Sequence, residues 1–134
     1  MTATLTAPTS TTRQIRRTGL LAGAAASVAT STTAAVASAL DVSLKVGGAA
    51  IPVIGFAQLT FVAAIIGTVM AVVISHRARR PRHTFIVSTI ALTALSIVPD
   101  ATADAHTSTR LLLALTHVVA ASIVIPALAS RLSD

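Results

Sequence analysis

Residues 53–75 form an unbroken apolar stretch that contains no Asp, Glu, Lys or Arg. As a helix with a rise of 1.5 Å per residue, this stretch would be about 34 Å long, which is enough to cross a hydrocarbon core of roughly 30 Å. A charge-free stretch of this length is typical of a transmembrane helix. It therefore constrains the whole chain, because the remaining segments must fold around a bilayer-spanning element.

Three further apolar stretches accompany this one, so the sequence predicts an all-α membrane protein, a bundle of four transmembrane helices. Hydrophobic residues make up 54% of the chain and charged residues 10%, against roughly 25% charged in soluble domains. The first residues are small, polar and without a hydrophobic period, which is typical of disorder. We expect a disordered cytoplasmic segment at 1–17 and a transmembrane domain at 18–132, with helices at about 18–40, 53–76, 84–100 and 110–130.

The short segment between the second and third stretches determines the predicted orientation. Within Ser75–His83 lie four arginines, Arg77, Arg79, Arg80 and Arg82. Short loops dense in Lys and Arg stay on the cytoplasmic side of a membrane. Eight of the ten Lys and Arg residues fall here or near the two termini, and only Lys45 and Arg110 fall on the other side. We therefore expect a multi-pass protein of the cell (plasma) membrane with both termini in the cytoplasm.

The first apolar stretch has two interpretations. As a retained helix, it would place large side chains toward lipid and small ones toward its neighbours. The large residues are Leu20, Leu21, Val28, Val36 and Leu40, and the small ones are Gly23, Ala26, Thr30, Ala34 and Ala37. As a signal peptide, Arg16 and Arg17 would precede an apolar region, and residues 36–39 would form a cleavage site. A retained helix is the simpler interpretation, because three further apolar stretches follow.

The segment from Asp41 to Pro52 alternates apolar and polar residues before the turn signal Gly47-Gly48. This pattern predicts a small extracytoplasmic β-hairpin between the first two helices. A two-stranded hairpin is marginal by itself, so it would have to pack on the helix ends. A loosely ordered loop is the alternative.

The second stretch carries a small residue at every fourth position: Ala63, Gly67, Ala71 and Ser75. Small side chains let another helix approach closely. We expect this stripe to be a packing face within the chain, with a dimer face as the alternative.

Polar residues recur at helical spacing in the third and fourth stretches. Thr89, Thr93, Ser96 and Asp100 share one face of the third. If Asp100 lies near Arg110, counting seven residues inward on each helix brings Thr93 level with His117. The pattern predicts a Thr93–His117 hydrogen bond inside the bundle and an Asp100–Arg110 charge pair at its outer end.

An ionisable residue within a membrane span is a functional site by default, and His117 is such a residue. The alternative is that a neutral His117 hydrogen-bonds a neighbouring helix and contributes only to packing. Pro126 should kink the fourth helix and free a backbone carbonyl. The candidate functional or structural polar positions are therefore His117, Thr93, Ser96, Asp100, Arg110 and Pro126.

The chain lacks the residue sets that most enzymes and metal sites use. It has no Cys and no Glu, no phosphate-binding glycine loop and no Ser–His–Asp set. Asp100, Asp104 and His106 could be read as an outer metal site, but their spacing matches no fixed motif, and a solvated loop is the alternative. We expect no catalytic, cofactor-binding or metal-binding residues. With no Trp or Tyr to stack on bases, we expect no nucleic-acid partner either.

Three hypotheses follow for the function. The first is a non-enzymatic integral membrane protein that acts through a membrane protein partner or as a homo-oligomer, with the lipid bilayer around it. The second is a subunit of a small transporter or channel, lined by the polar faces of the third and fourth helices. The third is a membrane-embedded enzyme that uses His117, which would require a second catalytic group beside this residue.

Three short segments in the second half of the chain carry a resemblance: Leu95–Pro99 (LSIVP), Leu115–Val119 (LTHVV) and Ile125–Leu128 (IPAL). With them, the chain resembles a family of small, uncharacterised four-helix integral membrane proteins from high-GC Gram-positive bacteria. Family members often have Met where this chain has Thr116 and Gly where it has Ala127. The resemblance implies the fold and the membrane location, with His117 and Pro126 as characteristic positions, and it implies no activity.

Overall fold

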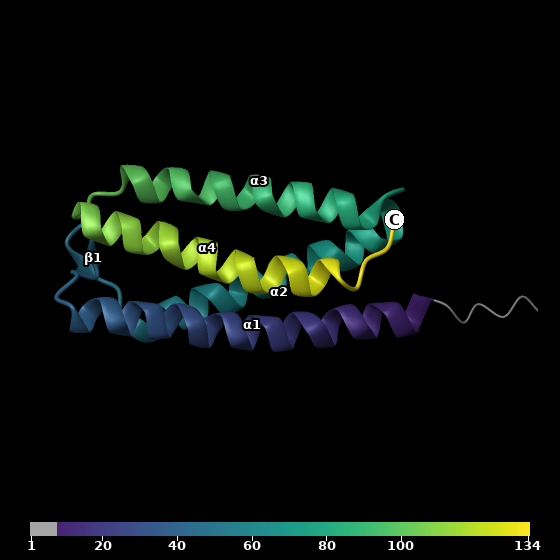
Figure 1. Ribbon diagram of the computed structural model, residues 1–134, viewed down its shortest axis with the longest axis horizontal. Coiled ribbons are helices and arrows are strands. Elements are labelled where there is room, and N and C mark those ends of the chain that lie inside the picture. Colours follow the sequence, from purple (N-terminus) through teal and green to yellow (C-terminus); the bar gives the residue numbers. More distant parts are fainter. Residues whose placement is uncertain (1–7) are drawn as a thin grey trace, which may run out of the picture.

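The computed structural model describes residues 8–134, which form four long helices and one two-stranded hairpin (Figure 1). In chain order these elements are α1 (Pro8–Ala39), β1 (Lys45–Val46), β2 (Ala49–Ala50), α2 (Val53–Arg77), α3 (Pro81–Thr102) and α4 (Thr107–Ala129). Each helix contains a stretch long and apolar enough to cross a membrane. The predicted fold class is confirmed. Residues 1–7, the first part of the segment predicted to be disordered, lie outside the described residues.

α1 begins at Pro8, so residues 8–17 are helical although the sequence predicts disorder for them. Proline is favoured in the first turn of a helix. Packing holds the added turns in place, because Ile15 is 0% exposed and lies in a buried cluster with Leu128 and Leu132. The sequence pattern does not predict this helical extension, because Ile15 is the only large apolar residue among residues 8–17.

The four helices lie side by side and run alternately up and down (Figure 1). The α2–α3 turn, the start of α1 and the C-terminus lie at one end, which we call the arginine end. The β1–β2 hairpin and the α3–α4 loop lie at the other, the hairpin end. α1 packs most extensively on α2 and also on α4, whereas α3 packs on α4 and contacts α2 less.

α1 and α2 approach closely because two glycines of α1 face short side chains of α2. A Cβ atom on Gly19 would overlap the Thr68 side chain, and one on Gly23 would lie 2.9 Å from the Ala64 Cβ. The large residues of α1 face outward, as Val28 illustrates with 67% exposure. The predicted division of α1 into an outward side of large residues and a packing side of small residues is confirmed.

The small-residue stripe predicted on α2 only partly marks a helix contact. Ala71 is buried, but Ala63 is exposed. The α2 residues that pack against α1 are Ala64 and Thr68, one position further along the chain. A shift of one residue turns the contact by about 100° around the helix, so Ala63 and Gly67 face a cavity on the α3 and α4 side instead.

The hairpin is short and is anchored to the helix ends. β1 and β2 pair antiparallel, with Val46 opposite Ala49. Gly47 and Gly48 both have positive φ, at 57° and 79°, as the tight two-residue turns of β-hairpins require. The Gly47 N–H donates to the Asp104 carbonyl at 2.8 Å, and the Thr109 hydroxyl donates to the Ser43 carbonyl at 2.6 Å. Contact with the α3–α4 loop therefore supports a hairpin that would be marginal alone.

α3 continues through Pro99 to Thr102, and α4 begins at Thr107. A proline in the last turns of a helix removes one backbone hydrogen bond without ending the helix. Figure 1 shows that α4 starts beyond the end of α3 along the long axis, because the connecting segment runs outward before α4 turns back. This overhang determines which residues of the two helices face each other.

Candidate functional site

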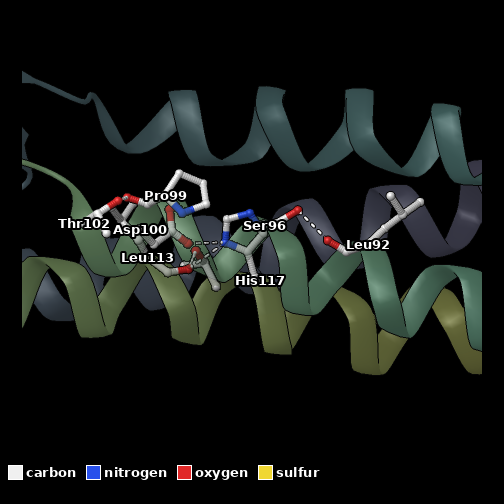
Figure 2. Close-up of polar contacts among 8 residues, drawn as sticks. Leu92, Ser96, Pro99, Asp100, Thr102, Leu113 and His117 are labelled. Carbon is white, nitrogen blue, oxygen red and sulfur yellow. Dashed lines mark hydrogen bonds and ion pairs between the residues drawn. The ribbon is translucent and has the colours of Figure 1, made fainter.

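Asp100 in the last turns of α3 and His117 on α4 face each other across the α3–α4 contact. The His117 Nδ1 atom lies 2.8 Å from the Asp100 Oδ2 atom (Figure 2). The same nitrogen lies 3.0 Å from the carbonyl oxygen of Leu113, one turn earlier on α4. Two oxygen atoms therefore converge on one nitrogen of the imidazole ring.

These two oxygens determine which ring nitrogen carries the hydrogen. A backbone carbonyl can only accept a hydrogen bond, so Nδ1 must be the protonated nitrogen. Its N–H is aligned with the Leu113 oxygen, and the Asp100 oxygen makes a second, electrostatic contact. In the neutral ring the other nitrogen, Nε2, keeps a free lone pair, and Figure 2 shows it on the side of the ring away from Asp100. His117 therefore offers a hydrogen-bond acceptor.

Asp100 is the more buried member of this pair. Its side chain is 13% exposed, against 41% for His117. The Oδ2 atom itself is buried and, within the part of the chain that the structure describes, accepts no well-aligned hydrogen bond. Because burying a carboxyl oxygen without a partner is costly, the nearby His117 N–H is the contact that compensates it. The pair thus ties α3 to α4 and fixes the orientation of the ring.

A cavity of about 340 Å³ lies among α2, α3 and α4, and His117 lines it. Thr60, Thr93 and Ser96 line the same hairpin-end portion, while most of the remaining wall is apolar. The cavity opens between α2 and α3, where the lining residues Ile66 and Leu92 are 64% and 50% exposed. The cavity is therefore open at the side of the bundle, between these two helices.

The hydroxyl groups beside His117 use their hydrogens within α3. Thr93 Oγ1 donates to the Thr89 carbonyl at 2.8 Å. Ser96 Oγ donates to the Leu92 carbonyl at 2.8 Å (Figure 2). A hydroxyl has one hydrogen, so each of these oxygens keeps only its capacity to accept. Thr60 Oγ1 lies 2.9 Å from Thr30 Oγ1, whose own hydrogen is directed to the Ser27 carbonyl, so the Thr60 hydroxyl donates to Thr30. The polar end of the cavity therefore combines four acceptors: three hydroxyl oxygens and the imidazole Nε2.

The hydrogen bond predicted between Thr93 and His117 does not form among the described residues. Both side chains line the cavity, but Thr93 bonds within its own helix and His117 faces Asp100. The prediction was wrong because it placed Asp100 level with Arg110. The overhang of α4 brings Asp100 level with His117 instead, about two turns further along α4.

Arg110 consequently lies apart from the acid that it was expected to pair with. Its Nε atom is buried and has no hydrogen-bond partner within residues 8–134. The structure therefore replaces the predicted Asp100–Arg110 pair with the Asp100–His117 pair. The sequence does place Asp100 and His117 on polar faces of their helices. It does not show how far the two helices are shifted along each other, and this shift decides which residues meet.

The other candidate positions lie away from this pair. Pro126 is inside α4 toward the arginine end, where the nearby Ser122 hydroxyl donates to the Val119 carbonyl at 2.8 Å. Asp104 and His106 are exposed in and beside the α3–α4 loop. Among the described residues, no group of three or more His, Cys, Asp or Glu side chains could hold a metal ion.

The four arginines of the α2–α3 turn lie at the opposite end from the Asp100–His117 pair. Segments far apart in the sequence meet there: Arg131 Nε donates to Thr18 Oγ1 at 3.0 Å, and the His83 N–H donates to Asp134 Oδ1 at 3.1 Å. The arginines are therefore grouped with both ends of the described chain and are separate from the cavity's polar end.

Comparison with known proteins identifies a family. A family model described as a family of unknown function (DUF6069) matches residues 10–134, nearly the whole chain. No curated protein matches, and no solved structure matches.

Proposed function

We propose that this chain, which belongs to the family of unknown function DUF6069, is a non-enzymatic membrane protein that acts by binding a partner molecule from the bilayer. The partner enters between α2 and α3 and lies against α4. One observation carries the proposal: the cavity has a lateral opening, apolar walls and a single polar end. Ligand sites are typically apolar concavities with a few convergent polar groups.

The size of the cavity argues for a slender molecule as the partner. From Phe85 to Ser96 it extends about 16 Å along α3. A helix of about 10 Å diameter would occupy more than roughly 1,000 Å³ over that length, which exceeds the volume of the cavity. The cavity therefore suits a single flexible chain and not a helix of another protein. Association of copies through other lipid-facing surfaces is a separate proposal.

We further propose that the protein resides in the cell membrane with the arginine end in the cytoplasm. The grouping of eight of the ten Lys and Arg residues at or near that end supports this orientation. Single cysteines at Ala78, Ala49 and Ala105, probed with an impermeant thiol reagent in intact cells, test it. Labelling at Ala78 and not at the other two would overturn it. The occurrence of the family in high-GC Gram-positive bacteria remains a prediction from the resemblance.

A membrane-embedded enzyme is the second candidate, and the Asp100–His117 contact favours it. A carboxyl group that fixes Nδ1–H leaves Nε2 available as a general base. The nearest hydroxyls donate their hydrogens to backbone carbonyls, as Ser96 does to Leu92. They therefore do not donate to Nε2, and the described site holds no activated nucleophile. Binding therefore remains the better-supported function.

A transport path receives less support. The arginine-end side of the cavity meets a fully buried cluster that includes Phe85 and Leu128, each 0% exposed. Within the described residues, a single chain thus offers a cavity with a closed end. Transport would require this cluster to separate or several copies to assemble.

Filling the cavity tests the binding proposal. Ala121 lines the cavity, whereas Ala91 on α3 is exposed and outside it. We compare the wild type, Ala121→Phe and Ala91→Phe, each extracted with its native lipids and analysed by mass spectrometry. The proposal expects one amphiphile to be enriched in the wild type and in Ala91→Phe and depleted in Ala121→Phe. The same enriched species at the same level in all three proteins would contradict it.

A further inference from the structure

We infer that the molecule bound in the cavity is an uncharged amphiphile with a hydroxyl headgroup and a long alkyl tail, held by a hydrogen bond from its hydroxyl to His117 Nε2. This inference rests on the proposed function and names the ligand of that same site. It follows from the hydrogen-bonding capacity of the polar end, from the cost of burying charge, and from the length of the apolar portion.

The polar end of the cavity can accept hydrogen bonds but can donate none. Nδ1–H of His117 faces the Leu113 and Asp100 oxygens, which leaves Nε2 as the acceptor. The Thr93 and Ser96 hydrogens are directed to backbone carbonyls at 2.8 Å. The Thr60 hydrogen is directed to Thr30 Oγ1 at 2.9 Å, because Thr30 itself donates to the Ser27 carbonyl. A headgroup that brings a hydrogen-bond donor therefore satisfies these groups, whereas a ketone, ether or ester leaves them unpaired.

The headgroup is also neutral. A carboxylate or phosphate would place its negative charge against the lone pairs of these acceptors. An ammonium group could donate, but it would have to leave water for a largely apolar cavity with no free counter-charge, because Asp100 already faces His117. Burying an unpaired charge costs far more than one hydrogen bond returns. A hydroxyl group donates a hydrogen bond and carries no charge, so it meets both requirements of the polar end.

The rest of the cavity suits a tail. Ser96 and His117 lie toward its hairpin end, and Phe85 and Ile125 lie toward its arginine end. A hydroxyl at Ser96 would be about 9 Å from the end of α3, close to the polar interface of the bilayer. The tail would then extend about 16 Å along α3 toward the buried cluster at Phe85.

Matched ligands test this inference. A long-chain alcohol and its methyl ether have the same tail, but only the alcohol donates a hydrogen bond. Binding of each to the full-length protein is titrated by native mass spectrometry. We expect the wild type to bind the alcohol about tenfold more tightly, the ratio given by one hydrogen bond of about 1.4 kcal/mol.

Two variants assign that preference to His117. Asp100→Asn keeps the ring and its Leu113 contact, and should retain the preference. Asp100→Asn with His117→Phe removes Nε2 without leaving a buried carboxyl group unpaired, and should reduce the preference severalfold, because only hydroxyl oxygens remain as acceptors. An unreduced preference in this double variant would overturn the role of His117.

The remaining outcomes separate the inference from the function that it rests on. Equal binding of alcohol and ether by the wild type would overturn the hydroxyl headgroup and leave the binding function in place. If an amine or a carboxylate with the same tail bound more tightly than the alcohol, the hydroxyl headgroup would likewise be overturned and the binding function would stand. If the wild type binds none of these ligands, and Ala121→Phe changes no co-purified lipid, both proposals are contradicted.

Discussion

His117 and Asp100 contact each other at 2.8 Å although Asp100 lies near the end of α3 and His117 lies well inside α4. The contact exists because α4 starts beyond the end of α3, so that the end of one helix faces the interior of the other. It places a buried carboxyl oxygen against the one ring nitrogen that carries a hydrogen. The same contact orients the ring toward the cavity and joins two helices.

A double-mutant cycle measures this contact. His117→Phe alone leaves the Asp100 oxygen buried without its N–H, whereas the same change in an Asp100→Asn background leaves a neutral amide. We therefore expect His117→Phe to cost about 1–3 kcal/mol more in the wild type than in Asp100→Asn. Unfolding midpoints in detergent for the four proteins give the coupling. Additive effects would remove the pair as a stabilising contact.

The close approach of α1 to α2 predicts opposite effects at two glycines. Gly19→Ala places a Cβ atom into the Thr68 side chain, and should destabilise the protein by about 1–3 kcal/mol. Gly55→Ala meets only an ordinary contact at 3.4 Å with Ile51 and improves helix propensity by up to about 1 kcal/mol. Thermal unfolding of both variants checks this. Equal stabilities would contradict the tight α1–α2 contact.

The hairpin should depend on its link to α4. Thr109 is 1% exposed and donates to the Ser43 carbonyl at 2.6 Å. Thr109→Val removes this bond and should cost about 1–2 kcal/mol, with faster amide hydrogen exchange at residues 45–50. Thr107→Val, at an exposed position two residues away, is the matched control. Unchanged exchange in Thr109→Val would show that the hairpin does not need this anchor.

The packing of α1 predicts that this helix is retained. α1 buries Ile15, Ala26 and Thr30, each 0% exposed, and its glycine face covers Ala64 and Thr68 of α2. Cleavage after residue 39 would expose that surface of α2. We therefore expect the protein purified from its own membrane to have the full mass of 13.5 kDa. A mass reduced by the first 39 residues would identify α1 as a signal peptide.

Much of this architecture can be predicted from composition and periodicity. The charge-free stretch at 53–75 and the lipid-facing side of α1 follow from burial in a bilayer, which depends on local sequence. The hairpin follows from Gly47-Gly48, because both residues need positive φ. These features are encoded within single segments.

The Asp100–His117 pair could not be predicted in the same way. Asp100 and His117 each lie on a predicted polar face, but their contact depends on how far α4 extends past α3. That displacement is set by the path of residues 103–106 and by the hairpin that packs on them. The helical start of α1 was missed for a similar reason, since the residues clustered with Ile15, among them Leu128 and Leu132, are distant from it in the chain.

The binding cavity itself can be probed directly, because the chain contains only two methionines, Met1 and Met70. Met70 lines the cavity, so growth with photo-methionine places a single reactive group in its wall. After irradiation of living cells, we predict a Met70 adduct with the mass of one membrane amphiphile, which is absent in Met70→Leu. A crosslinked second protein chain at Met70, or no adduct there, would contradict the account.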